Sequence, residues 1–144
     1  RLRWSNGALN ASLAVGALFC VVPPFLPEPV RGYVWALVWT GLILLLEPIN
    51  YRRGVPSLFR DWEHGELGRT LQLVMAGALC GVLWEFWNMW AYTKWVYTFP
   101  LGQSVKFFEM PVLGFLGFLP FALEYFVMFH FVASFFTAED ELGL

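Results

Sequence analysis

Long apolar runs separated by short polar stretches dominate this chain. Four runs, at residues 8–26, 32–46, 71–92 and 111–136, approach or exceed the ~20 residues of helix that cross the hydrocarbon core of a bilayer. Prolines interrupt the first run at Pro23-Pro24 and the fourth at Pro120, and a proline inside a helix removes a backbone donor and crowds the preceding turn. The pattern predicts an all-α, polytopic transmembrane bundle of about four spans, with Pro-kinked first and fourth helices.

The second run is predicted to end at Glu47-Pro48, because a residue before proline is pushed away from the helical region. Glu47 is therefore expected near an interface, with its carboxylate in water.

Two polar or interrupted stretches connect the predicted spans. Residues 50–70 carry mixed charges and several Gly and Pro residues, so we expect a surface loop with one short amphipathic helix over 56–66 that lies in the headgroup layer. Residues 93–110 are too interrupted to span and too apolar for a free loop. They are predicted to form an interfacial segment between the third and fourth spans, or to dip back toward the spans.

The composition agrees with lipid as the solvent. Of the 144 residues, 58% are hydrophobic and 14% charged, against about 25% charged in a soluble domain. The net charge of -2 gives no basic surface for nucleic acid, and the two cysteines lie in apolar runs without the spacing of a metal site. We interpret residues 1–144 as a single integral membrane domain. The start at Arg1 allows for it to be the C-terminal part of a longer chain.

The basic residues predict the orientation. With four spans, one side of the membrane carries six of them and the other side three. The six are Arg1, Arg3, Arg52, Arg53, Arg60 and Arg69, and the three are Arg31, Lys94 and Lys106. Because cytoplasmic loops carry the excess of Lys and Arg, the 50–70 loop and both termini are predicted to be cytoplasmic.

The third run has one face that changes from small to polar residues. Gly77-x-x-x-Gly81 is a small-residue pair that allows another helix to approach closely. Glu85 and Asn88 continue this face, since residues at i and i+3 are neighbours on a helix. Gly114 and Gly117 of the fourth run are expected to pack there, which would enclose a narrow apolar pocket between the third and fourth spans.

Two carboxyl groups, Glu85 and Glu124, lie deep within apolar runs. Hydrocarbon disfavours the charged form of such a group, so each is a candidate acid, and two that approach each other would share one proton. The other candidate ligand contacts are Asn88, Tyr92, Trp84, Trp95, Tyr97 and Phe121. Tryptophans near a membrane end are also common interface anchors, and this alternative stays open.

The order of Glu85, Trp95-Val96-Tyr97 and the segment ending in Leu123-Glu124-Tyr125-Phe126 resembles the membrane-embedded lycopene cyclase domain and related carotenoid hydratases. The resemblance implies a carotenoid or other isoprenoid ligand and proton transfer from a carboxylic acid. The cyclase pattern has two adjacent acids after a proline, whereas here Glu124 stands alone, four residues after Pro120.

A second class of function remains open from the sequence. A non-catalytic transmembrane subunit of a larger energy-transducing or photosynthetic complex would show the same small-residue ridges and interfacial tryptophans. In such a subunit His130 is a candidate axial ligand for a tetrapyrrole, although an interhelical hydrogen bond is the commoner role for a polar residue in a span. The lipid bilayer is the one certain partner on either interpretation, and no metal motif is present.

Overall fold

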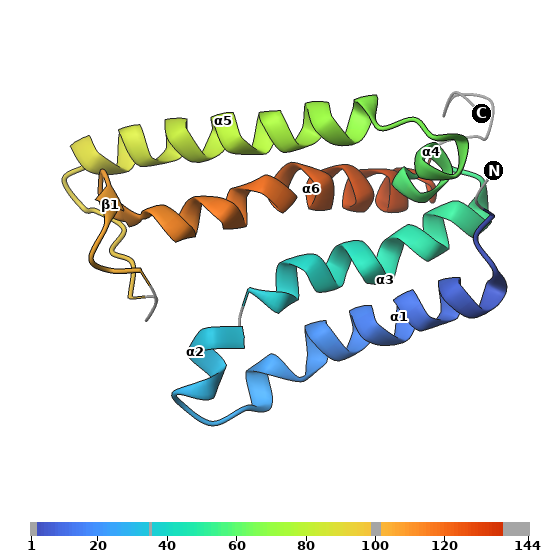
Figure 1. Cartoon of the computed structure of the whole chain (residues 1–144), viewed down its shortest axis with the longest axis horizontal. Helices are drawn as coiled ribbons and strands as arrows, with labels where there is room; N and C mark the ends of the chain where they lie inside the picture. The colour runs from blue at the N-terminus through green and yellow to red at the C-terminus, as the bar shows by residue number, and fades with distance from the viewer. Residues whose placement is uncertain (1–2, 35, 99–101, 137–144) are drawn as a thin grey trace.

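A computed structural model of the chain describes residues 3–34, 36–98 and 102–136. Four longer helices run alternately between the two ends of the molecule (Figure 1): α1 (Asn6–Val21), α3 (Leu37–Arg53), α5 (Gly68–Trp90) and α6 (Phe118–Ala133). The short elements are η1 (Pro23–Phe25), α2 (Val30–Val34), α4 (Leu58–His64), the strands β1 (Lys106–Phe107) and β2 (Met110–Pro111), and η2 (Val112–Gly117). The prediction of an all-α chain is confirmed, apart from the small β1–β2 hairpin.

Within the part of the chain that the structure describes, three helical stretches are long and apolar enough to cross a membrane. They are Asn6–Phe25, Gly68–Trp90 and Val112–Ala133, which correspond to the first, third and fourth predicted spans. The predicted second span falls on α3, whose 17 residues are fewer than the ~20 that a bilayer core requires. The structure therefore supports a helical membrane protein, and the count of four spans is not confirmed.

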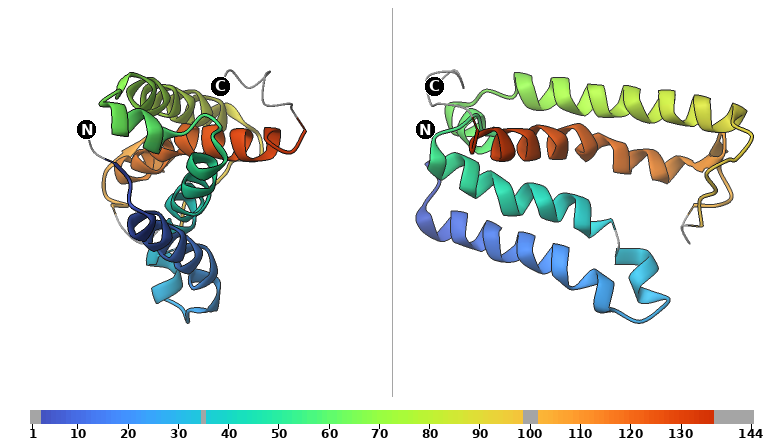
Figure 2. Two further views of the ribbon diagram at one scale, coloured as in Figure 1. Left: turned by 90° about the vertical axis from the view of Figure 1, so that its right-hand side faces the viewer. Right: turned by 180° about the vertical axis from the view of Figure 1, so that it is seen from behind.

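The distribution of side chains suits a lipid environment. On α5, the large apolar residues Leu71, Met75 and Leu79 are more than half exposed, whereas Gly77 and Gly81 are buried. In lipid, burying a leucine between helices gives no hydrophobic free energy, because lipid tails are equally apolar. Small residues at the contacts let neighbouring backbones approach. Figure 2 shows the helices in a row, α1 beside α3, α3 beside α6 and α6 beside α5.

The predicted proline kinks are not confirmed. Helix α1 ends at Val21, before Pro23, and the chain continues as the short 3-10 turn η1. Pro120 is the third residue of α6, in the first helical turn, where a backbone N–H has no intrahelical acceptor and a proline is tolerated. Pro23, Pro24 and Pro120, the prolines of the predicted kinks, thus lie at helix ends rather than in the middle of a helix.

The prediction for Glu47 is wrong. Helix α3 continues through Pro48 to Arg53, and Glu47 has no exposed surface. Its carboxylate accepts hydrogen bonds from the Ser57 hydroxyl at 2.6 Å and from the backbone N–H groups of Leu58 and Phe59 at 3.1 and 3.2 Å. These donors belong to the N-terminus of α4, which favours a negative group. The carboxylate is therefore satisfied by protein rather than by water.

The predicted amphipathic helix over 56–66 is present as α4, but its apolar side faces the protein. Leu58 and Phe59 are buried. The Trp4 ring stacks on Phe59 with ring centres 4.4 Å apart, and its indole N–H donates to the Phe59 carbonyl at 2.8 Å. Helix α4 therefore holds the start of α1 against the end of α3.

Glycines set the closest helix contacts. A Cβ at Gly16 of α1 would collide with the backbone of α3 at Leu45, and a Cβ at Gly77 of α5 would collide with the carbonyl oxygen of Phe118. Gly81, one turn further along α5, meets the Phe118 ring in the same way. These contacts exist because the residues at the crossing have no side chain.

We expect Gly77→Ala to destabilise the protein by about 1–3 kcal/mol, the usual cost of overpacking, because the added methyl group meets backbone that cannot move aside. Gly68→Ala is the matched control on the same helix, since a Cβ there has no neighbour within 4 Å. Thermal unfolding followed by circular dichroism in detergent should show a lower Tm for Gly77→Ala alone. Equal Tm values for the two variants would contradict this view of the crossing.

Candidate functional site

The end of α5 carries a short segment that folds back on the helix. The helix ends at Trp90, Ala91 is extended, and residues 91–98, which we name the strap, follow it. Asn88 holds the strap through its side chain: its Oδ1 accepts from the Trp95 N–H at 2.6 Å and its Nδ2 donates to the Trp95 carbonyl at 3.0 Å. The amide thus pairs with the backbone of the strap on both sides.

Glu85, one turn before Asn88, is fully buried. Its Oε1 accepts a hydrogen bond from the Tyr97 hydroxyl of the strap, and the Trp84 indole N–H donates to the same hydroxyl at 3.1 Å. Burial, and after it the hydrogen bond to Glu85, raises the pKa of Tyr97 above its ordinary value. Tyr97 is thus the donor of a hydrogen bond to Glu85, whose Oε2 has no hydrogen-bond partner among the described residues.

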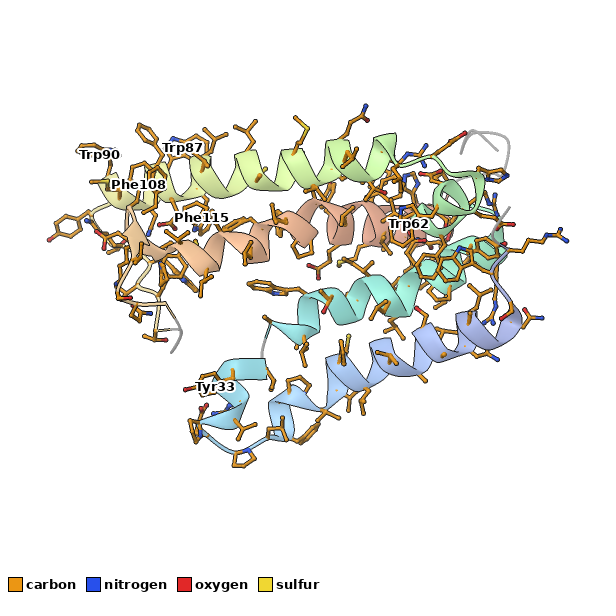
Figure 3. All side chains as sticks on the ribbon, viewed as in Figure 1. Tyr33, Trp62, Trp87, Trp90, Phe108 and Phe115 are labelled. Atoms are coloured by element: carbon orange, nitrogen blue, oxygen red, sulfur yellow. The ribbon has the colours of Figure 1, made fainter. Side chains whose placement is uncertain are left out.

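An open cavity of about 510 Å³ lies beside this pair. Its lining comes from the end of α5 and from the strap: Trp84, Trp87, Asn88, Ala91, Thr93, Lys94 and Trp95. We name it the tryptophan groove. Its volume falls in the range of small-molecule sites. Figure 3 shows Trp87 and Trp90 at this end of α5.

One ion pair connects the tryptophan groove to the β1–β2 hairpin. Lys94 Nζ lies 2.7 Å from Glu109 Oε1, and each side chain is about two-fifths exposed. Glu109 lies in the turn between the strands, after Phe108, whose φ of 55° makes this turn tight. The hydrogen bond and the charge of Lys94 lower the pKa of Glu109.

The structure brings together five of the predicted site residues. They are Glu85, Asn88, Trp84, Trp95 and Tyr97. Two of the predicted ligand contacts do not join this cluster, although Tyr92 belongs to the strap. Tyr92 is fully exposed, and Phe121 is half exposed on α6, where its ring faces that of Phe118 at 6.2 Å.

Glu124 does not approach Glu85. Helices α5 and α6 are antiparallel (Figure 1) and cross where Gly77 meets Phe118. Glu85 lies eight residues beyond Gly77 and Glu124 six residues beyond Phe118, in opposite directions along the contact. At 1.5 Å per residue the two carboxyl groups are roughly 20 Å apart along the helices. A shared proton between them is therefore not possible in this arrangement.

The four predicted glycines contact three different parts of the chain. Gly77 and Gly81 contact α6 at Phe118, as the small-residue pattern predicts. Gly114 lies against the Met110 side chain and Gly117 against the Trp39 ring of α3. The third and fourth spans do pack together, but the glycines of the second pair serve other contacts.

His130 lies on α6 between two aromatic rings. Phe126 and Phe129 face it edge-on, with ring centres 4.4 and 5.3 Å away. Its Nδ1 is buried and has no hydrogen-bond partner in the part of the chain that the structure describes. Within those same residues, no group of three or more His, Cys, Asp or Glu side chains could hold a metal ion.

Several residues of the tryptophan groove were not predicted. Trp87, Thr93 and Lys94 line it, and Glu109 pairs with Lys94. Trp87 follows Trp84 by one helical turn, a spacing that could have indicated a shared surface. The Lys94–Glu109 pair has no local signal, because its members are 15 residues apart in the chain.

Comparisons of the chain with protein-family models, with curated proteins and with solved structures found no match. The site is therefore described from its own geometry.

Asn88→Ala should release the strap, because the Trp95 N–H and carbonyl lose both partners. Lost hydrogen bonds of this kind cost about 1–3 kcal/mol, so amide exchange in residues 91–98 should become roughly tenfold faster or more, as measured by hydrogen–deuterium exchange and mass spectrometry. Tyr92→Phe, which alters a fully exposed side chain of the same strap, is the control. Unchanged exchange in the alanine variant would show that Asn88 does not hold the strap.

Proposed function

We propose that this chain is an integral membrane protein that holds a long apolar ligand of the isoprenoid or pigment type in the tryptophan groove. The observation that carries the proposal is the grouping of Trp84, Trp87 and Trp95 around an open cavity at the end of a membrane-length helix. The sequence predicts this ligand between the third and fourth spans. The tryptophan groove instead involves α5 and the strap, since α5 and α6 are in direct contact at Gly77 and Gly81.

The chemistry of the lining favours such a ligand. Indole rings offer broad apolar faces, and their N–H groups prefer the boundary between hydrocarbon and water. Trp84, Trp87 and Trp95 are each at least half exposed, so a ligand chain could cover them and remove that surface from water or lipid headgroups. Removing apolar area from water is worth roughly 25 cal/mol per Å², so covering the three exposed indole faces would contribute to the free energy of binding.

The second candidate is acid chemistry on the bound ligand, as the resemblance to carotenoid cyclases and hydratases implies. The favouring observation is Glu85, a buried carboxyl group whose Oε2 is unpartnered and whose Oε1 is held by Tyr97, next to Trp84 of the tryptophan groove. A proton transferred from Glu85 to an alkene carbon would leave a carbocation on the neighbouring carbon, which indole faces stabilise by cation–π attraction. Glu85 would act alone, because Glu124 lies on the other side of the helix crossing.

The test of binding uses tritiated geranylgeraniol and the detergent-purified full chain. We expect saturable binding that Trp87→Ala weakens about tenfold, because the variant removes one aromatic wall. Trp90→Ala is the matched control: Trp90 is as exposed as Trp87 and one turn away, but does not line the tryptophan groove. Absence of saturable binding, or equal loss in both variants, would refute the proposal.

The same purification separates the remaining alternatives. Partner subunits recovered in stoichiometric amounts with a tetrapyrrole would favour the accessory-subunit function. A cyclised or hydrated isoprenoid product that disappears in Glu85→Gln would favour acid chemistry, and full turnover in that variant would remove it.

We further propose that the end of the molecule carrying α4 faces the cytoplasm. Arg3, Arg52, Arg53, Arg60 and Arg69 lie on α4 or on the helix ends and connections around it, at one end of the molecule (Figure 1). Arg31, Lys94 and Lys106 belong to the connections at the opposite end. This excess of positive charge favours the cytoplasmic side.

Labelling with a membrane-impermeant maleimide tests the orientation. In a background with both native cysteines replaced by alanine, Glu66→Cys should react only after the cells are opened, whereas Gln103→Cys should react in intact cells. The reverse result would invert the proposed orientation.

A further inference from the structure

The polar groups of the tryptophan groove are mostly hydrogen-bond donors. Asn88 uses its carbonyl oxygen on the strap and keeps one amide hydrogen free, since Nδ2 carries two. Lys94 uses one of its three N–H groups on Glu109. Thr93 adds a hydroxyl group that can donate or accept. A ligand that satisfies these groups must present acceptors.

The charge of the tryptophan groove also favours a ligand that presents hydrogen-bond acceptors. Among the described residues that line it, Lys94 alone is ionisable, and its partner Glu109 lies outside the lining on the hairpin turn. Both side chains are about two-fifths exposed. An ion pair this exposed contributes little to stability, so an anion that enters the tryptophan groove can replace the Glu109 carboxylate at the lysine.

The tryptophan groove has an apolar part, formed by the tryptophans, and a charged part at Lys94. Lys94 and Trp95 are consecutive on the strap, just beyond the end of the membrane-length helix Gly68–Trp90. A lysine at such a boundary extends its ammonium group toward water while its stem follows apolar surface. The tryptophan groove thus suits a molecule whose chain lies on indole faces and whose head lies at Lys94.

We propose that the ligand of the tryptophan groove is an anionic amphiphile, a long apolar chain ending in a phosphate or carboxylate, and that Lys94 binds its head in exchange for Glu109. This inference rests on the proposed function, because it assigns the head group of the same ligand. Lys94 and Glu109 determine specificity for the head group, whereas the tryptophans bind the chain.

The experiment compares geranylgeranyl phosphate with geranylgeraniol, which share one chain and differ in the head. In phosphatidylcholine nanodiscs at fixed ionic strength, wild-type protein should bind the phosphate about tenfold more tightly than the alcohol. Lys94→Gln should remove this preference. Glu109→Gln should increase it several-fold, because the competing carboxylate is gone. Glu109→Gln, whose side chain lies outside the lining, should change the affinity for the alcohol by no more than about twofold, and a thermal unfolding temperature equal to that of the wild type shows that both variants remain folded.

The outcomes separate the two proposals. If neither compound binds saturably, the proposed function fails. If the alcohol binds and the phosphate has no advantage, or if the two variants leave the preference unchanged, the tryptophan groove is a ligand site but the anionic head is wrong.

Nanodiscs that contain phosphatidylglycerol identify the source of the anion. Weaker binding of geranylgeranyl phosphate in these discs, with no such weakening in Lys94→Gln, would show that bilayer lipids occupy the tryptophan groove through their phosphate. Equal binding in both kinds of disc, with the preference for phosphate retained, would assign it to a separate amphiphile.

Discussion

Direct backbone contact at glycines is the constraint on which the rest of the structure depends. Gly16 brings α1 onto α3, and Gly77 with Gly81 brings α5 onto α6 at Phe118. In lipid the apolar side chains gain nothing by turning inward, so close van der Waals contact must hold the helices together. The crossing of α5 and α6 also fixes the position of everything that connects them, which includes the strap, the hairpin and the start of α6.

The two ends of the molecule are built in the same way. At one end, Glu47 of α3 accepts hydrogen bonds from the first turn of α4. At the other end, Glu85 and Asn88 of α5 hold Tyr97 and Trp95 of the strap. In each case a buried polar side chain on a long helix forms hydrogen bonds with a short segment that follows the end of that helix. An unpaired polar group in an apolar environment is costly, so these pairings fix where the connecting segments lie.

This arrangement gives the tryptophan groove its particular character. Its floor is held firmly, because Asn88 pairs with the strap backbone on both sides. At its edge, Lys94 and Glu109 form an ion pair that is partly exposed to solvent and therefore contributes little to stability. A firm aromatic floor suits a chain with few polar groups, and an exchangeable cation at the rim suits a charged head. The buried Glu85 accepts a hydrogen bond from Tyr97 of the strap and lies outside the lining of the tryptophan groove.

The sequence by itself determined the features that depend on neighbouring residues. Apolar length located the membrane-length helices, and the i to i+3 spacing placed Glu85 and Asn88 on one face of α5. Trp95 and Tyr97 were named from the order of residues that carries the family resemblance, and the structure places them beside Glu85 and Asn88. Tertiary structure alone decided the rest. Glu47 is buried because α4 folds over it, Gly117 meets Trp39 rather than α5, and Glu124 is separated from Glu85. The pairing of Lys94 with Glu109 was decided in the same way. Each of these depends on the relative position of segments far apart in the chain. Contacts at glycines set that position, and the sequence shows where the glycines stand but not which segment each one meets.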